Sequence, residues 1–426
     1  MIRRMKIASF VEATEILNSF IPRPLNVRTV YSLDTIRALT KFLGNPQDAV
    51  RVVHIAGTSG KTSTAYYTAA LLQAAGKKVG LTISPHITEI NERVQLNLVP
   101  MAEAAFCAEL GLFMDEVAKS GLKPTYFELM MAFAYWEFAR QQVDYAVVEV
   151  GLGGLLDGSN IVSRADKVCV ITDIGFDHMH VLGSTIAEIT AQKAGIIHTG
   201  NDVFMHNQAS EVMTVVAAKC SEVRAQLHVV DVDDETRVAA LPLYQQRNMA
   251  LAAATVQFAL SRESRQLTDD IMRQAAHVHI PARMETFTVG NKTVVLDGAH
   301  NPQKLQAMAD SLREKFPGQT VAALVGFTQS KEVSLRENLA IVRGVADRIL
   351  VTSFGATQEH GQPSINPNDV AQAAQEAGVQ NVVTELDYRQ AVQALLRAPE
   401  PVLLVTGSLY LISYIHPLIL AATSGA

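Results

Sequence analysis

The segment VVHIAGTSGKTSTA, residues 52–65, restricts the possible folds of this chain more than any other part of the sequence. It begins as an apolar strand, turns at Gly57 and Gly60, and continues directly as a helix. A strand, a glycine-rich turn and a helix N-terminus in this order can surround phosphate oxygens with backbone N–H groups. The segment therefore predicts an α/β domain that binds a nucleotide at the end of a strand.

Within this loop, Lys61 is expected to reach the β- and γ-phosphates, and the hydroxyls of Thr62 and Ser63 to bind phosphate or magnesium. The spacing differs from the GxxxxGK[ST] pattern, because Ile55 stands where that pattern has its first glycine. The alternative is a tight turn with an incidental lysine. The preceding strand and the following helix favour nucleotide binding, but the loop alone does not distinguish kinases, ATPases, GTPases and ligases.

Apolar strand-like runs alternate with amphipathic helical stretches along the rest of the chain. The expected strands are 52–56, 78–83, 145–150, 168–172, 203–206, 293–297, 321–326, 348–353 and 402–407. The expected helices lie near 61–75, 102–119, 126–142, 184–195, 245–276, 303–315, 333–345, 367–377 and 388–397. This alternation predicts the α/β class: a doubly wound, mostly parallel sheet domain with the phosphate loop, and a smaller Rossmann-like α/β domain at the C-terminus. Pro281, in the segment 279–287, suggests a hinge, so the domains are placed at 1–281 and 286–426.

Composition narrows the class of protein further. At roughly 150 residues per domain, 426 residues suggest two or three domains. Lys and Arg number 36 against 42 Asp and Glu, and this net charge of −6 argues against a nucleic-acid partner. The three cysteines form no CxxC pair, which fits a reduced, cytoplasmic protein. The apolar run 401–422 contains Gly407, His416 and Pro417, so we interpret it as a buried strand and helix rather than a membrane span, and Glu12 and Glu15 interrupt any signal-peptide core.

Polar residues follow several of the expected strands, where doubly wound sheets place their sites. Ser84, Glu149 and His178 are candidate ligands of a magnesium ion. Glu149 stands in an apolar VVEVG run where an unpaired carboxylate is costly. Imidazole is an unusual magnesium ligand, so a hydrogen bond from His178 to Asp177 or to the backbone is an equal alternative. Spacing alone favours an ordinary solvated helix residue for Lys193.

Two further stretches have simple structural explanations. The apolar and aromatic run 126–138 predicts a buried core helix rather than a pterin pocket, because it is apolar nearly all round. The acidic stretch 231–235 predicts a solvated loop rather than a metal site.

Motifs from residue 43 to residue 412 occur in an order that resembles the folylpolyglutamate synthase and dihydrofolate synthase family, part of the Mur ligase superfamily. They are LGNPQ (43–47), HIAGTSGKTST (54–64), ISPHITEINERV (83–94), TYFELMMAFAYWEFA (125–139), DYAVVEVGLGG (144–154), Asp157 with Asn160, ITDIGFDHMHVLG (171–183), QKAGII (192–197), IPARMETF (280–287), LDGAHNP (296–302) and VTGSLYLI (405–412). The resemblance implies that ATP phosphorylates a carboxylate of a folate or dihydropteroate substrate and that the amine of L-glutamate attacks the acyl phosphate. It also implies a monomer, and closure of two domains that excludes water.

The resemblance also implies roles for individual residues. The phosphate loop would hold ATP through Gly57, Thr58, Ser59, Gly60, Lys61, Thr62 and Ser63, with Asn248, Arg283 and Asp297 as further nucleotide contacts. Ser84, Glu149 and His178 would hold Mg²⁺. Lys193 would be carbamylated and bind a second metal ion, which reverses the interpretation from spacing. His300 would lie near the glutamate, and Lys61, Lys193, Asp297 and His300 would be the catalytic residues.

Departures from the family pattern concern the two glycine-rich turns. Ser59 stands where the family usually has Asn, and Thr62 where it often has Gly. The turn GGLLDGSN has Leu155 in place of the arginine of GGR-x-DATN, which removes a positive charge. A Mur-type ligase for another carboxylate and a non-catalytic nucleotide-binding homologue are the alternatives. Only 56 residues precede Gly57, which disfavours a peptidoglycan-type ligase with an additional N-terminal domain of roughly 100 residues.

Overall fold

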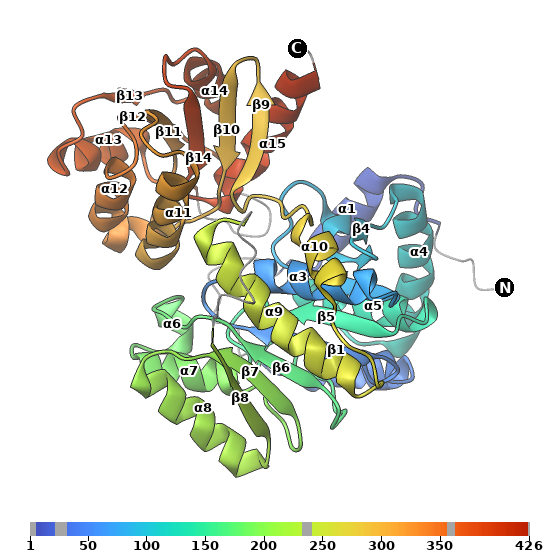
Figure 1. The fold of residues 1–426 in the computed structure, drawn as a ribbon. Helices are drawn as coiled ribbons and strands as arrows, with labels where there is room; N and C mark the ends of the chain where they lie inside the picture. Colours follow the sequence, from blue (N-terminus) through green and yellow to red (C-terminus); the bar gives the residue numbers. More distant parts are fainter. Residues whose placement is uncertain (1–5, 22–31, 232–240, 356–362, 425–426) are drawn as a thin grey trace. The chain divides into compact units, whose positions relative to one another are not determined.

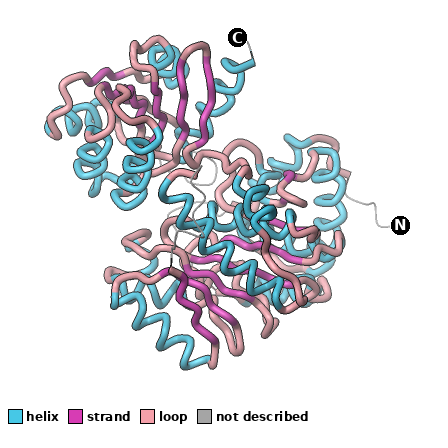
Figure 2. Tube along the Cα trace, viewed as in Figure 1, coloured by secondary structure: helices cyan, strands magenta, loops and turns pink. Residues whose placement is uncertain are grey.

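The strand before the phosphate loop, β1 (Arg51–Ala56), lies inside an eight-stranded sheet in the computed structural model of the chain. The structure describes residues 6–21, 32–231, 241–355 and 363–424. The chain divides into two compact units, the first formed by Met1–Ala240 with Gln245–Val278 and the second by Leu241–Tyr244 with His279–Ala426. Each unit contains one mostly parallel sheet with helices on its faces (Figures 1 and 2). The expected two-domain α/β fold is confirmed.

The sheet of the first unit has the order β4-β3-β2-β5-β1-β6-β7-β8. Its strands are β1, β2 (Val79–Thr82), β3 (Gln95–Leu96), β4 (Val99–Pro100), β5 (Tyr145–Glu149), β6 (Val168–Ile171), β7 (Asp202–His206) and β8 (Gln226–Val230). All neighbours from β2 to β8 are parallel, and β3 and β4 are antiparallel at one edge. Ile55 of β1 is in register with Glu149 of β5 and with Val170 of β6. The residues that follow these three strands therefore meet at one edge of the sheet.

Helices cover both faces of this sheet (Figure 1). They are α1 (Phe10–Asn18), α2 (Asp34–Phe42), α3 (Lys61–Ala74), α4 (Glu103–Ser120), α5 (Tyr126–Arg140), α6 (Met179–Leu182), α7 (Ile186–Ala194), α8 (Ser210–Val223), α9 (Leu243–Ser261) and α10 (Asp269–Ala276), with 3₁₀ turns at Pro46–Asp48 and Ile90–Arg93. Helix α3 packs on β1, β2 and β5 and against α10, and α7 packs against α8. The helix of the phosphate loop is thus fixed by the sheet beneath it.

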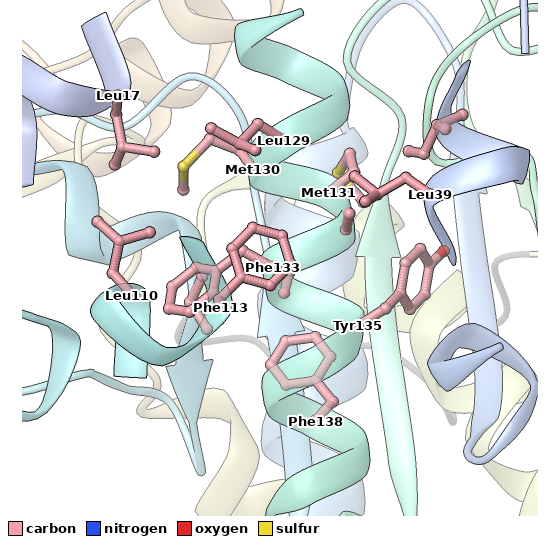
Figure 3. Close-up of a cluster of buried hydrophobic side chains, with 14 of the residues drawn as sticks. Leu17, Leu39, Leu110, Phe113, Leu129, Met130, Met131, Phe133, Tyr135 and Phe138 are labelled. Atoms are coloured by element: carbon pink, nitrogen blue, oxygen red, sulfur yellow. The ribbon is translucent and has the colours of Figure 1, made fainter. Parts of the chain in front are cut away.

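Helix α5 is the centre of the core between the sheet and α1, α2 and α4. Figure 3 shows its side chains, among them Phe133, directed toward Leu110 and Phe113 of α4 on one side and Leu39 of α2 on the other. The ring of Phe133 lies 5.4 Å from that of Phe106 and 5.3 Å from that of Phe113, between centroids. The expectation of a buried helix for residues 126–138 is confirmed.

Truncation of Phe133 tests this core. Phe133→Ala is expected to lower the free energy of unfolding by about 3–5 kcal/mol, because the buried ring is lost and a cavity remains. Urea denaturation followed by circular dichroism measures the change. Val11→Ala on α1 is the control, since Val11 is 67% exposed and its truncation should cost less than about 0.5 kcal/mol. Equal effects of the two variants would contradict the role of Phe133.

The second unit contains a six-stranded sheet with the order β13-β12-β11-β14-β10-β9. Its elements are β9 (Glu285–Val289), β10 (Lys292–Leu296), α11 (Pro302–Lys315), β11 (Val321–Val325), a 3₁₀ helix (Gln329–Ser334), α12 (Leu335–Arg343), β12 (Arg348–Val351), α13 (Pro367–Glu376), β13 (Val382–Thr384), α14 (Tyr388–Leu396), β14 (Val402–Thr406) and α15 (Leu409–Ser424). Only β9 pairs antiparallel, with β10. The run 401–422 forms β14 and most of α15, as expected, and no helix within the described ranges is long and apolar enough to cross a membrane.

The structure differs from the sequence-based expectations in several elements, and α1, α2, α8, β3, β4, β8 and β13 were not predicted. The single helical stretch expected at 245–276 is two helices, α9 and α10, with Ser264 between them in the left-handed region at φ 57°. The hinge expected at 279–287 contains the first residues of β9. Of the acidic stretch 231–235, residues 232–235 lie outside the described residues.

Candidate functional site

The phosphate loop connects β1 to α3 and needs glycine at both turn positions. A Cβ atom on Gly57 would stand 1.8 Å from Thr172 Oγ1, which follows β6. Gly60 has φ +90°, and a Cβ there would stand 2.4 Å from Asn248 Oδ1 on α9. Gly60 is also the N-cap of α3 and offers no side chain to its first amides. The N-terminus of a 14-residue helix, with its positive dipole, therefore lies at the loop.

Two lysines converge on the carbonyl oxygen of Gly57. Lys61 Nζ donates to it at 3.1 Å and Lys193 Nζ at 2.8 Å. Lys193 is buried in the last turn of α7, so the interpretation from spacing, an ordinary solvated lysine, is wrong. Two side-chain cations beside a helix N-terminus form a strong site for an anion.

Asp173 contacts the phosphate loop and pairs with Arg247, and the sequence analysis predicted neither residue as part of the site. The carbonyl of Asp173 accepts hydrogen bonds from the amides of Thr58 at 2.9 Å and Ser59 at 3.1 Å. The Asp173 carboxylate pairs with the Arg247 guanidinium, with Nη2 to Oδ1 at 2.9 Å and Nε to Oδ2 at 3.2 Å. The available signal was the position of Asp173, two residues after β6, in the ITDIGFDH motif. Arg247 is adjacent to the predicted Asn248, whose side chain is buried over Gly60.

A group of oxygen atoms lies beside the loop at the ends of β2 and β5. The Glu149 carboxylate accepts a hydrogen bond from Thr62 Oγ1 at 2.8 Å and another from the Ser84 amide at 3.2 Å. Ser84 Oγ is buried and has no hydrogen-bond partner among the described residues. A carboxylate, a hydroxyl and an orphaned hydroxyl oxygen are the hard ligands that magnesium prefers. This group fits the expected metal.

His178 is placed differently from Glu149 and Ser84. It lies just before α6 with φ 45°, its side chain is 47% exposed, and its Nε2 is 3.7 Å from Asp177 Oδ1. Across the ranges that the structure describes, no three His, Cys, Asp or Glu side chains are grouped closely enough to hold a metal ion by themselves. A magnesium ion at Glu149 would therefore take other ligands from hydroxyls, water and phosphate.

The glycine-rich turn after β5 rests on the helix that carries Lys193. The Leu155 amide donates to the Gln192 carbonyl at 2.7 Å, and Asn160 Nδ2 donates to the Gly195 carbonyl at 3.0 Å. The Leu155 side chain is 42% exposed. Asp157 is buried within the turn and accepts from the Leu152 amide at 2.7 Å. Burial raises the pKa of Asp157, and the nearby charge of Lys61 opposes this shift.

Asp297, Arg283 and His300 lie together in the second unit, around the end of β10. Asp297 Oδ2 accepts from the Tyr244 hydroxyl at 2.8 Å and from the Met284 amide at 2.9 Å. Burial raises the pKa of Asp297, and the positive charge of Arg283 opposes this. His300 Nδ1 donates to the Gly298 carbonyl at 2.7 Å, which leaves Nε2 to accept from Lys304 at 3.2 Å.

The sequence matches two family profiles, the Mur ligase middle domain over residues 55–268 and the Mur ligase glutamate ligase domain over residues 282–409. It is 32% identical to the folylpolyglutamate synthase of Lacticaseibacillus casei over 420 residues, covering 91% of this chain and 94% of that protein. It is 30% identical to the dihydrofolate synthetase of Saccharomyces cerevisiae over 412 residues, covering 89% of this chain and 95% of that protein.

The solved structures agree with these matches. The folylpolyglutamate synthase of Mycobacterium tuberculosis complexed with ADP superimposes with a TM-score of 0.84 at 28% identity, covering 97% of this chain and 99% of that one. The two profiles place the chain in the Mur ligase class: the phosphate loop and the Glu149 oxygen group lie within the middle domain, and the second α/β unit contains the glutamate ligase domain. The chain belongs to the folylpolyglutamate synthase and dihydrofolate synthase family within that class.

Proposed function

We propose that this protein is an ATP-dependent ligase that joins L-glutamate to a folate, to dihydropteroate, or to both, through an acyl phosphate. The observation that carries the proposal is the convergence of Lys61 and Lys193 on Gly57, beside the Glu149 oxygen cluster. This arrangement suits the transfer of a phosphoryl group, which requires neutralised charge and a positioned acceptor. Membership in the family supplies the acceptor, a carboxylate, and the attacking amine.

Residue roles follow from this proposal. Residues 57–63, with Asn248, Arg283 and Asp297, bind ATP. Lys61 neutralises the phosphate that is transferred, and its place at the N-terminus of α3 supports this role. His300 acts near the glutamate, where its Nδ1–H···O bond to Gly298 fixes its tautomer. We assign ATP binding to the domain 1–281 and glutamate ligation to the domain 286–426, in a cytoplasmic monomer.

Magnesium belongs to the same proposal. Ser84 and Glu149 would hold the ion together with ATP oxygens, and His178 is a further candidate ligand. Ser84 Oγ supports the assignment: it is buried and has no hydrogen-bond partner in the described part of the chain, and such a hydroxyl is costly unless it has a ligand. When bound, the ion supplies positive charge to the outer phosphates.

Carbamylation of Lys193, with a second metal ion, is the remaining part of the proposal. The structure contains the unmodified side chain, whose Nζ donates to Gly57. Its buried position beside the phosphate loop supports the role. The carbamate is an anion, so in the modified protein Lys61 and the metal ions, and not Lys193, would supply the positive charge at the loop. Carbon NMR of protein equilibrated with ¹³C-bicarbonate tests it: a carbamate signal is expected in the wild type and absent in Lys193→Arg. The same spectrum from both proteins would contradict it.

One assay tests the function. Purified protein, ATP, magnesium and labelled L-glutamate are incubated with dihydropteroate, with a folate, or with neither, and products are identified by mass. Amide formation and phosphate release that need both glutamate and a pteridine acid are the expected result. Phosphate release that depends on another carboxylate would favour a different Mur-type ligase. ADP binding without any turnover would favour a non-catalytic homologue.

Leu155→Arg tests the departure in the glycine-rich turn. We expect the restored cation to raise kcat/KM for folate substrates by about fivefold, since a partly exposed charge contact is worth about 1 kcal/mol. Steady-state kinetics with varied folate measures this. Leu155→Met, which keeps an apolar side chain, should leave kcat/KM unchanged, and the same value for all three proteins would show that the missing arginine is irrelevant.

A further inference from the structure

Arg283 lies between two residues in an unfavourable backbone conformation. Ala282 has φ +55° and Met284 has φ +50°, in the left-handed region, where residues with a Cβ atom lose roughly 1 kcal/mol or more each. Both flanking side chains are buried, and the Ala282 carbonyl accepts a 2.9 Å hydrogen bond from Arg283 Nη1. Such strain persists only where surrounding contacts enforce it, and it is concentrated at functional sites.

Two buried carboxylates enforce this conformation, one on each side of Arg283. Glu285 Oε2 accepts from the Ala282 amide at 2.8 Å, and Asp297 Oδ2 accepts from the Met284 amide at 2.9 Å. The Gly298 amide donates to the Ala282 carbonyl at 2.9 Å. Asp297 is already assigned to the nucleotide, but no role has yet been given to Glu285.

Glu285 is itself held by two histidines. Its Oε1 accepts from His279 Nε2 at 2.8 Å and from His416 Nε2 at 3.0 Å. Its side chain is 2% exposed, whereas that of His279 is 67% exposed. Burial acts to raise the pKa of Glu285, but the hydrogen bonds from His279, His416 and the Ala282 amide lower it to about 2. The carboxylate is therefore ionised at neutral pH and accepts the hydrogen bond from the Ala282 amide as a charged group.

We infer that Glu285 is a positioning residue for Arg283: it fixes the strained turn 282–284 and so sets where the guanidinium lies within the second unit. The inference rests on the proposed function, which makes Arg283 a nucleotide contact. Glu285 is assigned no contact with substrate, because both of its oxygens are used inside the second unit. The conformational entropy of ordering Arg283 is therefore lost during folding and not when the nucleotide binds.

A double-mutant cycle on the full chain tests the inference. Glu285→Gln keeps the shape and one acceptor oxygen but removes the charge, and we expect it to raise KM for ATP about fivefold with kcat nearly unchanged. In an Arg283→Ala background the same substitution should have no further effect, because the group that it positions is gone. Equal effects in both backgrounds would overturn the inference, since a purely structural role does not depend on Arg283.

The same cycle is measured for the dissociation constant of ADP by calorimetry. If the wild type does not join glutamate to a pteridine acid, the proposed function is rejected. The double-mutant cycle on the dissociation constant of ADP would still decide the role of Glu285. If Glu285→Gln fails to fold, His279→Asn takes its place. This substitution removes one hydrogen-bond donor to Glu285 and changes a side chain that is largely exposed. A weaker but still Arg283-dependent loss of affinity is then expected, and no change in affinity would overturn the inference.

Discussion

Lys61→Ala is expected to lower kcat/KM by about a thousandfold while the protein remains folded. Loss of one cation that stabilises a transferring phosphoryl group costs about 4 kcal/mol of transition-state energy. The fold should survive, because Lys193 still donates to the Gly57 carbonyl at 2.8 Å and α3 stays packed on the sheet. Initial rates with saturating glutamate and varied ATP measure the effect.

A matched control separates the position of Lys61 from the loss of any lysine. Lys119→Ala removes a surface lysine that pairs with Glu116, three residues earlier on α4, and should leave the rate within about twofold. Thermal melting should give similar midpoints for both variants. A Lys61→Ala rate within tenfold of the wild type would contradict the assignment of this lysine to phosphoryl transfer.

Glu149→Gln is expected to lower kcat/KM about a hundredfold and to raise the magnesium concentration needed for half-maximal rate. The amide keeps the shape and an oxygen for the Thr62 hydroxyl, so the main loss is the negative charge that a divalent cation needs. That charge is worth about 3 kcal/mol at a preorganised site. Magnesium titrations at fixed ATP measure both quantities.

Ser84→Ala provides a graded test of the same cluster. It removes only the hydroxyl, so a smaller loss, about tenfold, is expected. Glu116→Gln on the surface of α4 is the control and should behave as the wild type. A magnesium requirement that is the same in all four proteins would place the ion elsewhere.

The sequence predicted the sheets well because parallel strands are buried on both faces and therefore appear as continuous apolar runs. VVHIA, YAVVEV and VLLVT all became central strands. The β3–β4 hairpin was not predicted because each strand has two residues, too few to show an alternation of apolar and polar side chains. Strand β9 was not predicted, because Pro281 indicates a hinge in this segment. The two-residue turn Gly290–Asn291, which joins β9 to β10 as an antiparallel hairpin, was the local signal for it.

The site was predicted only in part, because some of its residues are brought together by contacts between distant parts of the sequence. Glu149 ends β5 and the loop residues follow β1, so topology alone brings them to one edge of the sheet. The Asp173–Arg247 pair joins residues 74 positions apart, so the position of Asp173 after β6 does not predict which distant side chain pairs with it. Burial reverses the interpretation of Lys193, and a helix lysine gives no sign of burial when only its neighbours in sequence are considered.

The oxygen that receives both Lys61 and Lys193 belongs to the main chain. Every amino acid carries that oxygen, so no replacement at position 57 deletes the acceptor; it can only displace it through the steric conflict with Thr172. Natural or laboratory variants that separate the two lysine side chains from this oxygen must therefore change a lysine or the path of the backbone. Screens for altered nucleotide use should concentrate diversity at positions 61 and 193.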